Sequence, residues 1–258
     1  MLILLSPAKT LDFDEPAPVE ETTRPALLPD AQQLAGQLRE FPPAQLGRLM
    51  GISAKLAALV ADQYDQWENA PAASRAKPAL FAYRGDVYAG LDADSFTAKN
   101  VAFAQDHLRI LSGLYGVLRP LDLIQPYRLE MATPLKTRRG KDLYEFWGER
   151  ITRELEKALT EQQDETIVNL ASNEYFKAVD AQALGARVVT PTFKDKKDGK
   201  YRFLTFYGKR ARGQMARYLI QRQLKRPDSL KKSYAVDGYR FNGELSSERE
   251  WVFTRDEP

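Results

Sequence analysis

The sequence predicts an α+β fold, a single compact unit in which a mixed β-sheet is surrounded by helices. Short apolar runs such as Leu2–Leu5 and Thr166–Ala171 have the length and composition of buried strands. Longer segments such as Lys141–Leu159 place apolar residues at helical spacing. Because no internal repeat or low-complexity linker divides the chain, we expect one domain over residues 1–258. Two closely packed lobes are the alternative.

The N-terminal part is expected to contain one strand and two helices. Leu2–Leu5 forms the strand, and a turn over Ser6–Thr10 follows it. Asp30 is suited to capping a helix that the Pro42–Pro43 pair ends, and Ser53 is suited to capping the next one. We interpret these helices as scaffold.

In the middle of the chain, two short strands precede two helices. Ala79–Tyr83 and Asp86–Tyr88 have strand-like composition. Asn100 is suited to capping a helix over Val101–Ser112. The Lys141–Leu159 segment carries a single apolar stripe, which predicts a packed helix.

The C-terminal part alternates strands, turns and helices. After the strand Thr166–Ala171, Ser172 opens a helical turn that reaches Lys177. The later elements are expected, in chain order, as a strand Arg187–Phe193, a hairpin turn at Asp198–Gly199, a returning strand Tyr201–Phe206, a helix Lys209–Leu224, a second hairpin turn at Asp237–Gly238 between Tyr234–Val236 and Tyr239–Phe241, and a strand Glu250–Thr254. The hairpins make part of the sheet antiparallel.

Residue composition excludes several kinds of site. The chain has no cysteine, which excludes disulfides, thiolate zinc sites, cysteine-held iron–sulfur clusters and a cysteine nucleophile. Its one histidine, His107, excludes paired-histidine metal motifs, and we interpret it as a structural residue within a helix. Only metal sites built from oxygen ligands remain open. We predict no stable metal centre and no cofactor.

The sequence carries no signal for a membrane. Its apolar start, Met1–Leu5, is too short for a secretion signal, and no window approaches the roughly twenty apolar residues of a membrane span. A cytoplasmic location without a membrane partner is therefore expected.

Charge is distributed unevenly along the chain. The net charge of +3 and the isoelectric point near 8.9 are only mildly basic. Acidic residues dominate between Asp12 and Asp30, whereas Lys and Arg dominate between Lys194 and Lys232. This asymmetry predicts one basic surface that faces a polyanion.

The segment Leu108–Pro120 predicts a helix-hairpin-helix element. A helix runs into Gly113 and Gly116, and helix-compatible apolar residues follow. Backbone N–H groups at the start of the second helix would hold a phosphate, while Tyr115 and Arg119 reach the backbone of a duplex. The alternative is a glycine that ends a helix, followed by a structural turn.

A second basic element spans Tyr207–Ile220. On a helix, four cations surround an apolar stripe and supply several contacts for phosphates: Lys209, Arg210, Arg212 and Arg217. A basic helix face exposed to solvent is the alternative. The hairpin Lys194–Lys200 adds further lysines, although such tips are often only solvated.

Polar side chains also gather near the ends of predicted strands. They form three groups along the chain: Ser6 with Lys9, then Tyr127 with Arg128 and Glu130, and last Asn169 with Ser172, Glu174 and Lys177. A lysine beside a carboxylate can serve as a nucleophile with a proton-transfer partner, which makes Lys9, Glu130, Asn169 and Lys177 the candidate catalytic residues. Capping and buried ion pairing are the structural alternative.

Several ordered motifs resemble the YaaA (UPF0246, DUF328) peroxide-stress family across essentially the whole chain. They are Ser6–Thr10, Gly85–Tyr88, His107–Asp122, Gln125–Met131, Gly140–Tyr144 and Asn169–Ser172. The resemblance implies a bacterial cytoplasmic protein of unusual fold, with a helix-hairpin-helix and a positively charged cleft. It also implies DNA binding and protection against hydrogen peroxide.

These observations lead to two main hypotheses of function, with a purely structural or partner-binding protein as the third. The first is a DNA-binding protein, largely independent of sequence, that holds duplex or branched DNA by its phosphates. Its expected DNA-binding residues are Gly113, Tyr115, Gly116, Arg119, Arg128, Lys209, Arg210, Arg212 and Arg217. The second is an enzyme that acts on a nucleotide, a damaged base or a small acid through the Lys9, Glu130, Asn169 and Lys177 region.

Overall fold

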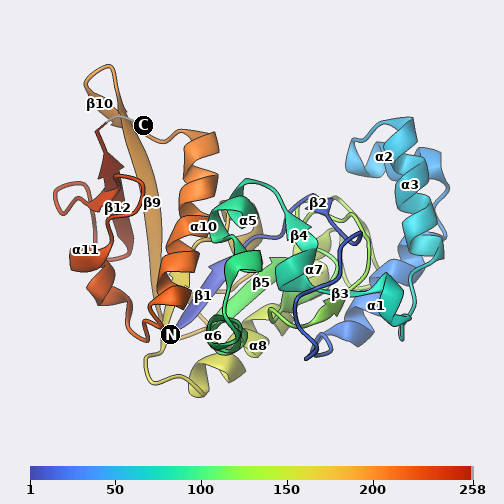
Figure 1. The fold of residues 1–258 in the computed structure, drawn as a ribbon. Helices are drawn as coiled ribbons and strands as arrows, with labels where there is room; N and C mark the ends of the chain where they lie inside the picture. The colour runs from blue at the N-terminus through green and yellow to red at the C-terminus, as the bar shows by residue number, and fades with distance from the viewer. Residues whose placement is uncertain (257–258) are drawn as a thin grey trace.

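The structure, a computed structural model, is built around one mixed β-sheet and describes residues 1–256, without the side chain of Ala73. Its eight strands lie in the order β11-β12-β9-β8-β1-β5-β6, with β10 paired to β9 (Figure 1). Their bounds are β1 Leu2–Leu5, β5 Leu108–Ser112, β6 Gly116–Leu118, β8 Thr166–Asn169, β9 Arg187–Lys197, β10 Lys200–Arg202, β11 Arg240–Phe241 and β12 Glu250–Arg255. The strands from β12 to β5 are parallel, and β6, β10 and β11 pair antiparallel.

β1 lies in the interior of the sheet, between β8 and β5, and all four of its residues are apolar and buried. Ile3 pairs with Leu108 on one side and with Val168 on the other. A strand covered on both faces needs a continuous apolar run, which the sequence Leu-Ile-Leu-Leu supplies.

Helices cover the sheet and extend beyond one end of it. Figure 1 shows α10 beside β9 with α5 against it, whereas α1, α2 and α3 are grouped at the end of the molecule opposite β9 and β12. The helices are α1 Leu28–Arg39, α2 Pro43–Met50, α3 Ala54–Asp65, α4 Ala79–Ala82, α5 Asp86–Leu91, α6 Ala98–His107, α7 Leu143–Trp147, α8 Arg150–Thr160, α9 Asn173–Phe176, α10 Thr205–Gln221 and α11 Leu230–Ser233. No helix within the described residues has the length and apolar character needed to cross a membrane.

Two small antiparallel pairs lie outside the main sheet. β2 (Thr10–Leu11) pairs with β4 (Tyr83–Arg84), and β3 (Lys77–Pro78) pairs with β7 (Leu123–Ile124). The first pair fixes the turn after β1 against the segment that leads into α5.

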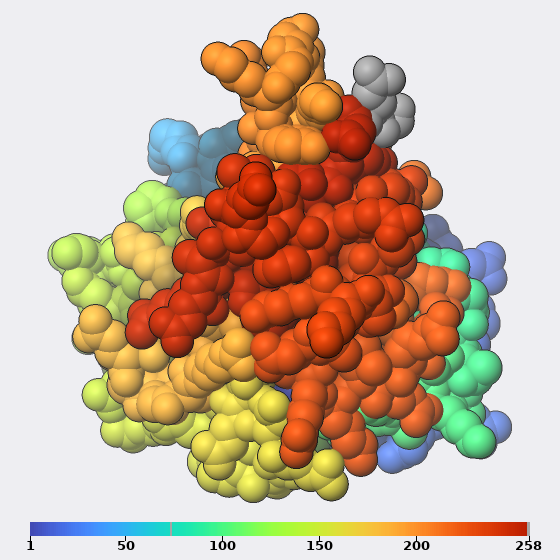
Figure 2. Space-filling view, turned by 90° about the vertical axis from the view of Figure 1, so that its left-hand side faces the viewer, coloured from blue at the N-terminus to red at the C-terminus, as the bar shows by residue number. Residues whose placement is uncertain are grey.

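The C-terminal part of the chain forms one face of the molecule. Figure 2 shows this part, coloured orange to red, over most of the visible surface, with the tip of β9 and β10 projecting from it. β9 and β12 are parallel neighbours over six residue pairs, from Thr190 with Glu250 to Asp195 with Arg255. Asp195 is fully buried there and accepts hydrogen bonds from Tyr239 and Arg255.

The predicted helix-hairpin-helix at Leu108–Pro120 is wrong. The segment forms the antiparallel hairpin of β5 and β6, with Ile110 opposite Leu118 and Ser112 opposite Gly116. Every residue of both strands is buried. The run is mostly apolar, and a short apolar run is compatible with a buried strand as well as with a helix. Helix α6 ends one residue earlier, at His107.

Other predicted elements are also corrected. Ala79–Tyr83 and Asp86–Tyr88 are mainly helical, as α4 and α5. The helix expected over Lys141–Leu159 is broken at Gly148, whose φ of 49° ends α7 before α8 begins. Asp237–Gly238 forms no hairpin between the predicted strands, because β11 pairs with β12 instead.

Several predictions are confirmed. β1 and β8 lie where the apolar runs indicate, and β9 and β10 form the hairpin turned at Asp198–Gly199. The Ser53 side chain caps α3 by accepting a hydrogen bond from the Leu56 N–H. Helix α6, by contrast, begins at Ala98, with Thr97 and not Asn100 as its N-cap, and the two residues share a capping box.

Candidate functional site

A cleft of about 480 Å³ opens at the carboxyl ends of β1 and β8. The chain leaves β1 toward β5 on one side and leaves β8 toward β9 on the other, so the connections diverge at this point. A divergence of this kind is where open parallel sheets bind ligands. The walls come from Ser6–Thr10, Arg84–Tyr88, Tyr127–Glu130, Leu170 with Ser172, Glu174 and Tyr175, and Lys209 with Arg212.

Two serines join the strand ends at the base of the cleft. Ser6 Oγ accepts a hydrogen bond from the Ser172 N–H at 2.8 Å and donates to Ser172 Oγ at 3.3 Å. The Tyr88 hydroxyl donates to the Ser6 carbonyl at 3.0 Å. These bonds hold α5 and both strand ends in a fixed relation.

One carboxylate in the cleft holds two cations. Glu130 lies 2.8 Å from Lys9 Nζ and accepts a hydrogen bond from the Arg128 guanidinium at 3.0 Å. The Lys9 side chain is 63% exposed, whereas that of Arg128 is 18% exposed. The group therefore carries one positive charge in excess, and most of its accessible part is Lys9.

The helix α10 contributes two cations without acidic partners. Lys209 and Arg212 lie three residues apart on the same face, and neither has a carboxylate within 4.0 Å among residues 1–256. Partial burial of Arg212 removes water from its guanidinium and lowers its pKa. Arg84, the remaining basic residue of the cleft, is paired with Asp12 and Asp94. Unpaired positive charge in the cleft therefore comes mainly from α10.

Close contact between α5 and α10 positions these two cations. A Cβ added to Gly213 would lie 1.8 Å from the Val87 carbonyl oxygen, and one added to Gly90 would lie 2.2 Å from the Arg210 carbonyl oxygen. The two backbones can approach this closely only because both positions are glycine. α10 thereby presents Lys209 and Arg212 beside the Arg84–Tyr88 wall.

A row of hydroxyl groups lies under the cleft. The Tyr127 hydroxyl is 2.7 Å from both Ser112 Oγ and the Tyr83 hydroxyl. Burial raises the pKa of Tyr127 to about 12, so the phenol stays neutral well into the alkaline range. The hairpin of β5 and β6 therefore supports the cleft from below, through Ser112.

The structure brings together five of the site residues predicted from sequence. Lys9, Arg128, Glu130, Lys209 and Arg212 all line the cleft, although they come from three distant parts of the chain. Sequence reasoning missed the wall formed by Arg84–Tyr88. The motif Gly-Asp-Val-Tyr, which occurs there, was a signal that could have marked it.

The remaining predicted DNA-binding residues lie elsewhere. Tyr115 is 1% exposed, and the backbones at Gly113 and Gly116 are packed against Leu129 and Trp147. Their burial, together with the β-hairpin, leaves no backbone N–H site for a phosphate there.

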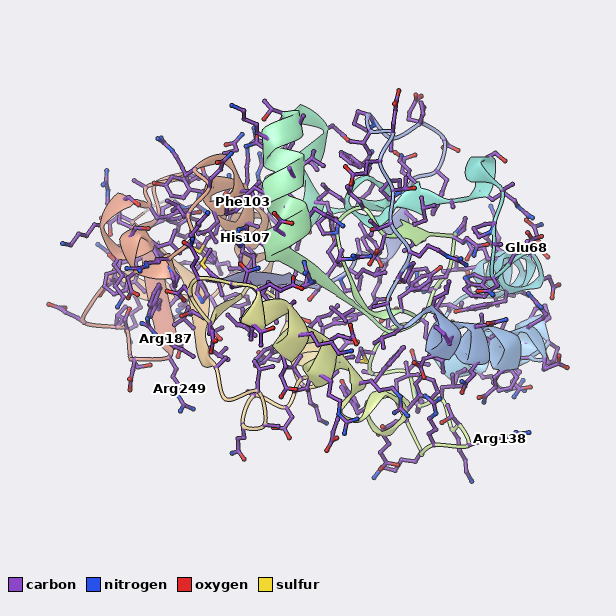
Figure 3. The ribbon with its side chains drawn as sticks, turned by 90° about the horizontal axis from the view of Figure 1, so that it is seen from below. Glu68, Phe103, His107, Arg138, Arg187 and Arg249 are labelled. Carbon is purple, nitrogen blue, oxygen red and sulfur yellow. The ribbon has the colours of Figure 1, made fainter. Side chains whose placement is uncertain are left out.

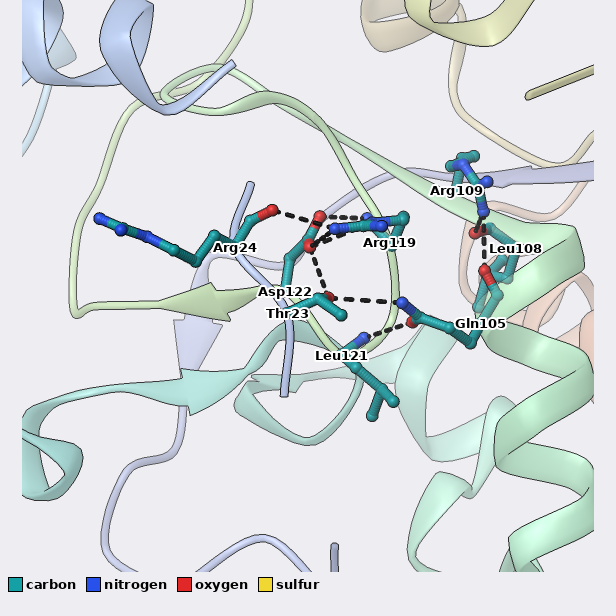
Figure 4. Close-up of polar contacts among 8 residues, drawn as sticks. All are labelled: Thr23, Arg24, Gln105, Leu108, Arg109, Arg119, Leu121 and Asp122. Atoms are coloured by element: carbon teal, nitrogen blue, oxygen red, sulfur yellow. Dashed lines mark hydrogen bonds and ion pairs between the residues drawn. The ribbon is translucent and has the colours of Figure 1, made fainter. Parts of the chain in front are cut away.

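Two further predicted DNA-binding residues, Arg119 and Arg217, are engaged in ion pairs. Figure 4 shows Arg119 against Asp122, which accepts from its backbone N–H at 2.8 Å and from its guanidinium at 3.0 Å. Arg217 pairs with Asp92 at 2.8 Å, and both border a separate hollow together with Arg210.

Two of the candidate catalytic residues are separated from the cleft by their own contacts. Asn169 is 2% exposed, and its amide accepts from the Ala171 N–H and donates to Thr190 Oγ1. Lys177 Nζ lies over the Tyr144 ring, 4.6 Å from its centroid. Only Lys9 and Glu130 of the four meet. Within residues 1–256, no group of three or more histidine, aspartate and glutamate side chains is arranged to hold a metal ion.

Comparison with known proteins identifies the family. A family model described as "Peroxide stress protein YaaA" matches residues 1–245. The chain belongs to the YaaA peroxide stress protein family. It is similar to a UPF0246 protein of Saccharophagus degradans, with 52% identity over 99% of both chains, and to one of Cellvibrio japonicus, with 51% identity over the full length of both. A third UPF0246 protein, from a Janthinobacterium species, is 52% identical over 99% of this chain and 98% of its own. The similarity to these relatives spans the residues that form both the sheet and the cleft.

Proposed function

We propose that this YaaA family member acts in peroxide stress by binding DNA through the phosphates of its backbone, with the cleft as the centre of the contact. The observation that carries the proposal is the pair of cations on α10, Lys209 and Arg212, which line the cleft without acidic partners. A positive charge without a counter-ion in a hollow attracts an anion, and a guanidinium can bind a phosphate by two parallel hydrogen bonds.

The other cleft cations support the same ligand. Lys9 and Arg128 share the single carboxylate of Glu130, so a phosphate gains a favourable contact with either of them. Contacts to phosphates carry no sequence information, and we therefore expect binding that tolerates any sequence.

Two outer elements extend the proposed surface. In Figure 1 the tip of β9 and β10 and the helix pair α2–α3 stand at opposite ends of the same upper side of the molecule. The tip carries exposed lysines at 196, 197 and 200. α2 and α3 form a helical hairpin turned at Gly51, whose φ is 63°, with Arg48 and Lys55 beside the turn. We propose this pair, in place of Leu108–Pro120, as the helical hairpin that the resemblance implies.

The salt dependence of DNA binding tests the role of α10. The variant Lys209→Gln/Arg212→Gln removes two phosphate contacts, so the slope of log K against log salt concentration should become shallower by about 2. Fluorescence anisotropy with a labelled duplex and a labelled four-way junction, from low to moderate salt, measures the slope. The matched control is Lys157→Gln/Lys232→Gln, which removes the same charge from residues outside the cleft.

The proposal fails if the wild-type chain binds neither DNA at low salt, or if the cleft variant and the control give equal affinity and slope. In cells that lack the family protein, survival after hydrogen peroxide should be restored by the control and not by the cleft variant. Equal restoration by both would separate the stress role from the cleft.

A second candidate function rests on the contact between Lys9 and Glu130, 2.8 Å apart at the end of β1. A lysine amine beside a carboxylate can form an imine with the aldehyde of an abasic site in DNA, with release of water. Borohydride reduces such an imine to a stable adduct, which a denaturing gel detects. We expect an adduct with wild-type protein and none with Lys9→Gln, and its absence from both would remove this candidate.

A further inference from the structure

Exposed aromatic side chains gather at the start of α10, beside the cleft. Phe203 is 46% exposed, Phe206 is 60% exposed and Tyr207 is 36% exposed. Within the part of the chain that the structure describes, only two other large apolar side chains are comparably exposed, Leu59 and Leu245. We call Phe203, Phe206 and Tyr207 the aromatic platform. Clustering of this kind on a surface marks a place of contact with a ligand or partner.

The rings of the aromatic platform are held by their neighbours. Phe203 packs on Gly208, where an added Cβ would lie 2.7 Å from the ring. Phe206 and Tyr207 meet edge to face, with ring centroids 5.6 Å apart. Because these contacts restrict the rings while leaving much of their surface exposed, a ligand meets a partly ordered surface, and less side-chain entropy is lost on binding.

Cations are interleaved with the aromatic platform. The Arg212 guanidinium lies 5.8 Å from the centroid of Phe203. Arg255 lies 5.0 Å from the centroid of Tyr207, but it is buried and paired with Asp195 and Asp237, so it supports the ring and offers no charge to a ligand. Lys209, which follows Tyr207 by two residues, lines the cleft. Phe206, Tyr207, Lys209 and Arg212 lie within about the first two turns of α10, and Phe203 lies just before it. The surface thus offers flat apolar faces beside positive charges.

This combination matches the chemistry of unpaired nucleotides. Exposed bases stack on aromatic rings, and the phosphates between them contact lysine and arginine. Bases within a continuous duplex are covered on both faces by their neighbours and cannot reach the rings. A purely apolar protein segment would leave Lys209 without a counter-charge.

We propose that the aromatic platform binds unpaired nucleotides of a single-stranded or locally opened nucleic acid, whose phosphates contact Lys209 and Arg212. This proposal rests on the proposed function and names the form of nucleic acid that the site prefers. Single-stranded DNA, or the open part of a gapped or branched duplex, should therefore bind more tightly than a continuous duplex.

A base analogue tests the stacking directly. A single-stranded oligonucleotide that contains 2-aminopurine loses fluorescence when that base stacks, so titration with wild-type protein should change its signal. Phe206→Leu keeps an apolar side chain and removes the flat ring, and should weaken binding on the order of tenfold. Phe206→Tyr retains the ring and should bind as wild type does. Leu245→Ala, which truncates an exposed apolar residue outside the platform, is the control.

The outcomes separate the two proposals. Equal binding by Phe206→Leu, Phe206→Tyr and wild type, with duplex DNA still bound through Lys209 and Arg212, overturns the aromatic platform and leaves the proposed function in place. Equal loss in both Phe206 variants points to apolar docking of another kind and also overturns it. If neither single-stranded nor duplex DNA binds, the proposed function fails first. Thermal unfolding of Phe206→Leu should match that of wild type, because the side chain is mostly exposed.

Discussion

Arginine residues of this chain differ in what they can bind because their neighbours differ. Arg212 borders the cleft without an acidic partner, whereas Arg217, five positions later on the same helix, donates to Asp92 and Ser95. Five residues turn an α-helix far enough to put the two side chains on different faces. Arg119 is likewise engaged in an ion pair, because the buried carboxylate of Asp122 accepts a hydrogen bond from its guanidinium. The positive charge of Arg212 is therefore available to a ligand, whereas the charges of Arg217 and Arg119 are largely neutralised by their aspartate partners.

The single histidine offers a prediction at the same scale. His107 is 8% exposed, its ring stacks on Phe103 with centroids 4.0 Å apart (Figure 3), and its Nδ1 lies 2.9 Å from the Met1 carbonyl oxygen. Burial disfavours the charged ring and lowers the pKa of His107 below its usual value near 6.5. Proton NMR should show one histidine resonance whose midpoint lies below that value.

The sign of the effect on stability follows from this shift. Above the pKa of the unfolded chain, both states hold neutral histidine. As the pH falls below about 6.5, the unfolded chain takes up a proton first, so the free energy of unfolding decreases until the folded pKa is reached. Urea titrations at several pH values in this range give the free energy of unfolding of wild type and His107→Gln. This free energy should decrease with falling pH more steeply in wild type than in the variant. An NMR titration midpoint for His107 at or above pH 6.5 would contradict the prediction.

At the scale of elements, the crossing of α5 and α10 is the contact that shapes the cleft. The sequence presents Gly213 only as a residue that weakens a helix, but its missing side chain is what allows the Val87 backbone to approach. Met215 and Leu219 of α10 are buried, and the helix also packs against β9 of the sheet. The helix is thus fixed from two sides.

Substitution of this glycine should be costly. Gly213→Ala places a Cβ 1.8 Å from the Val87 carbonyl oxygen, so the helices must move apart, and the free energy of unfolding should fall by about 3 kcal/mol or more. DNA binding should weaken as well, since Lys209 and Arg212 move with α10. Chemical denaturation and anisotropy measure the two effects.

Gly36→Ala in α1 is the matched control, because nothing lies within 4 Å of its added Cβ. The better helix propensity of alanine should raise stability there by up to about 1 kcal/mol. Equal effects at the two glycines would show that the crossing does not depend on the absent side chain.

At the scale of the molecule, the cleft exists because distant segments meet at one edge of the sheet. Ser6 and Ser172 are 166 residues apart in sequence and share a hydrogen bond. α10 arrives from a third part of the chain and closes the site from the side. A nucleic-acid ligand would therefore contact groups from all three parts and stabilise the folded protein as a whole.

Resistance to oxidation is a property of the whole molecule that can be measured. The chain has no cysteine and four methionines, of which Met1, Met131 and Met215 are fully buried, whereas Met50 is partly exposed. Peroxide should convert Met50 to its sulfoxide first, because accessibility controls this reaction. Peptide mass spectrometry after graded treatment should find one added oxygen at Met50 before any other methionine. Oxidation in denaturant, where all four react, is the control, and early oxidation of Met131 or Met215 in the folded protein would contradict the prediction.

The sequence by itself determined the elements whose local signal is strong. Four consecutive apolar residues define β1, and Ser53 defines the start of α3. The basic residues in α10 are marked only as a set of four, Lys209, Arg210, Arg212 and Arg217. The grouping of polar residues at strand ends also marked Lys9 and Glu130 as candidates, although their contact is a finding of the structure. The absence of cysteine limits the available chemistry without any structure.

Only the tertiary structure decided the rest. Leu108–Leu118 forms a buried hairpin because β5 pairs with one side of β1 and β6 pairs with β5. Periodicity cannot distinguish a short buried strand from a helix. Which cations are neutralised depends on carboxylates that come from other elements, such as Asp92 for Arg217. Local sequence sets backbone preference, whereas partners, burial and open space are set by contacts between residues far apart in the chain.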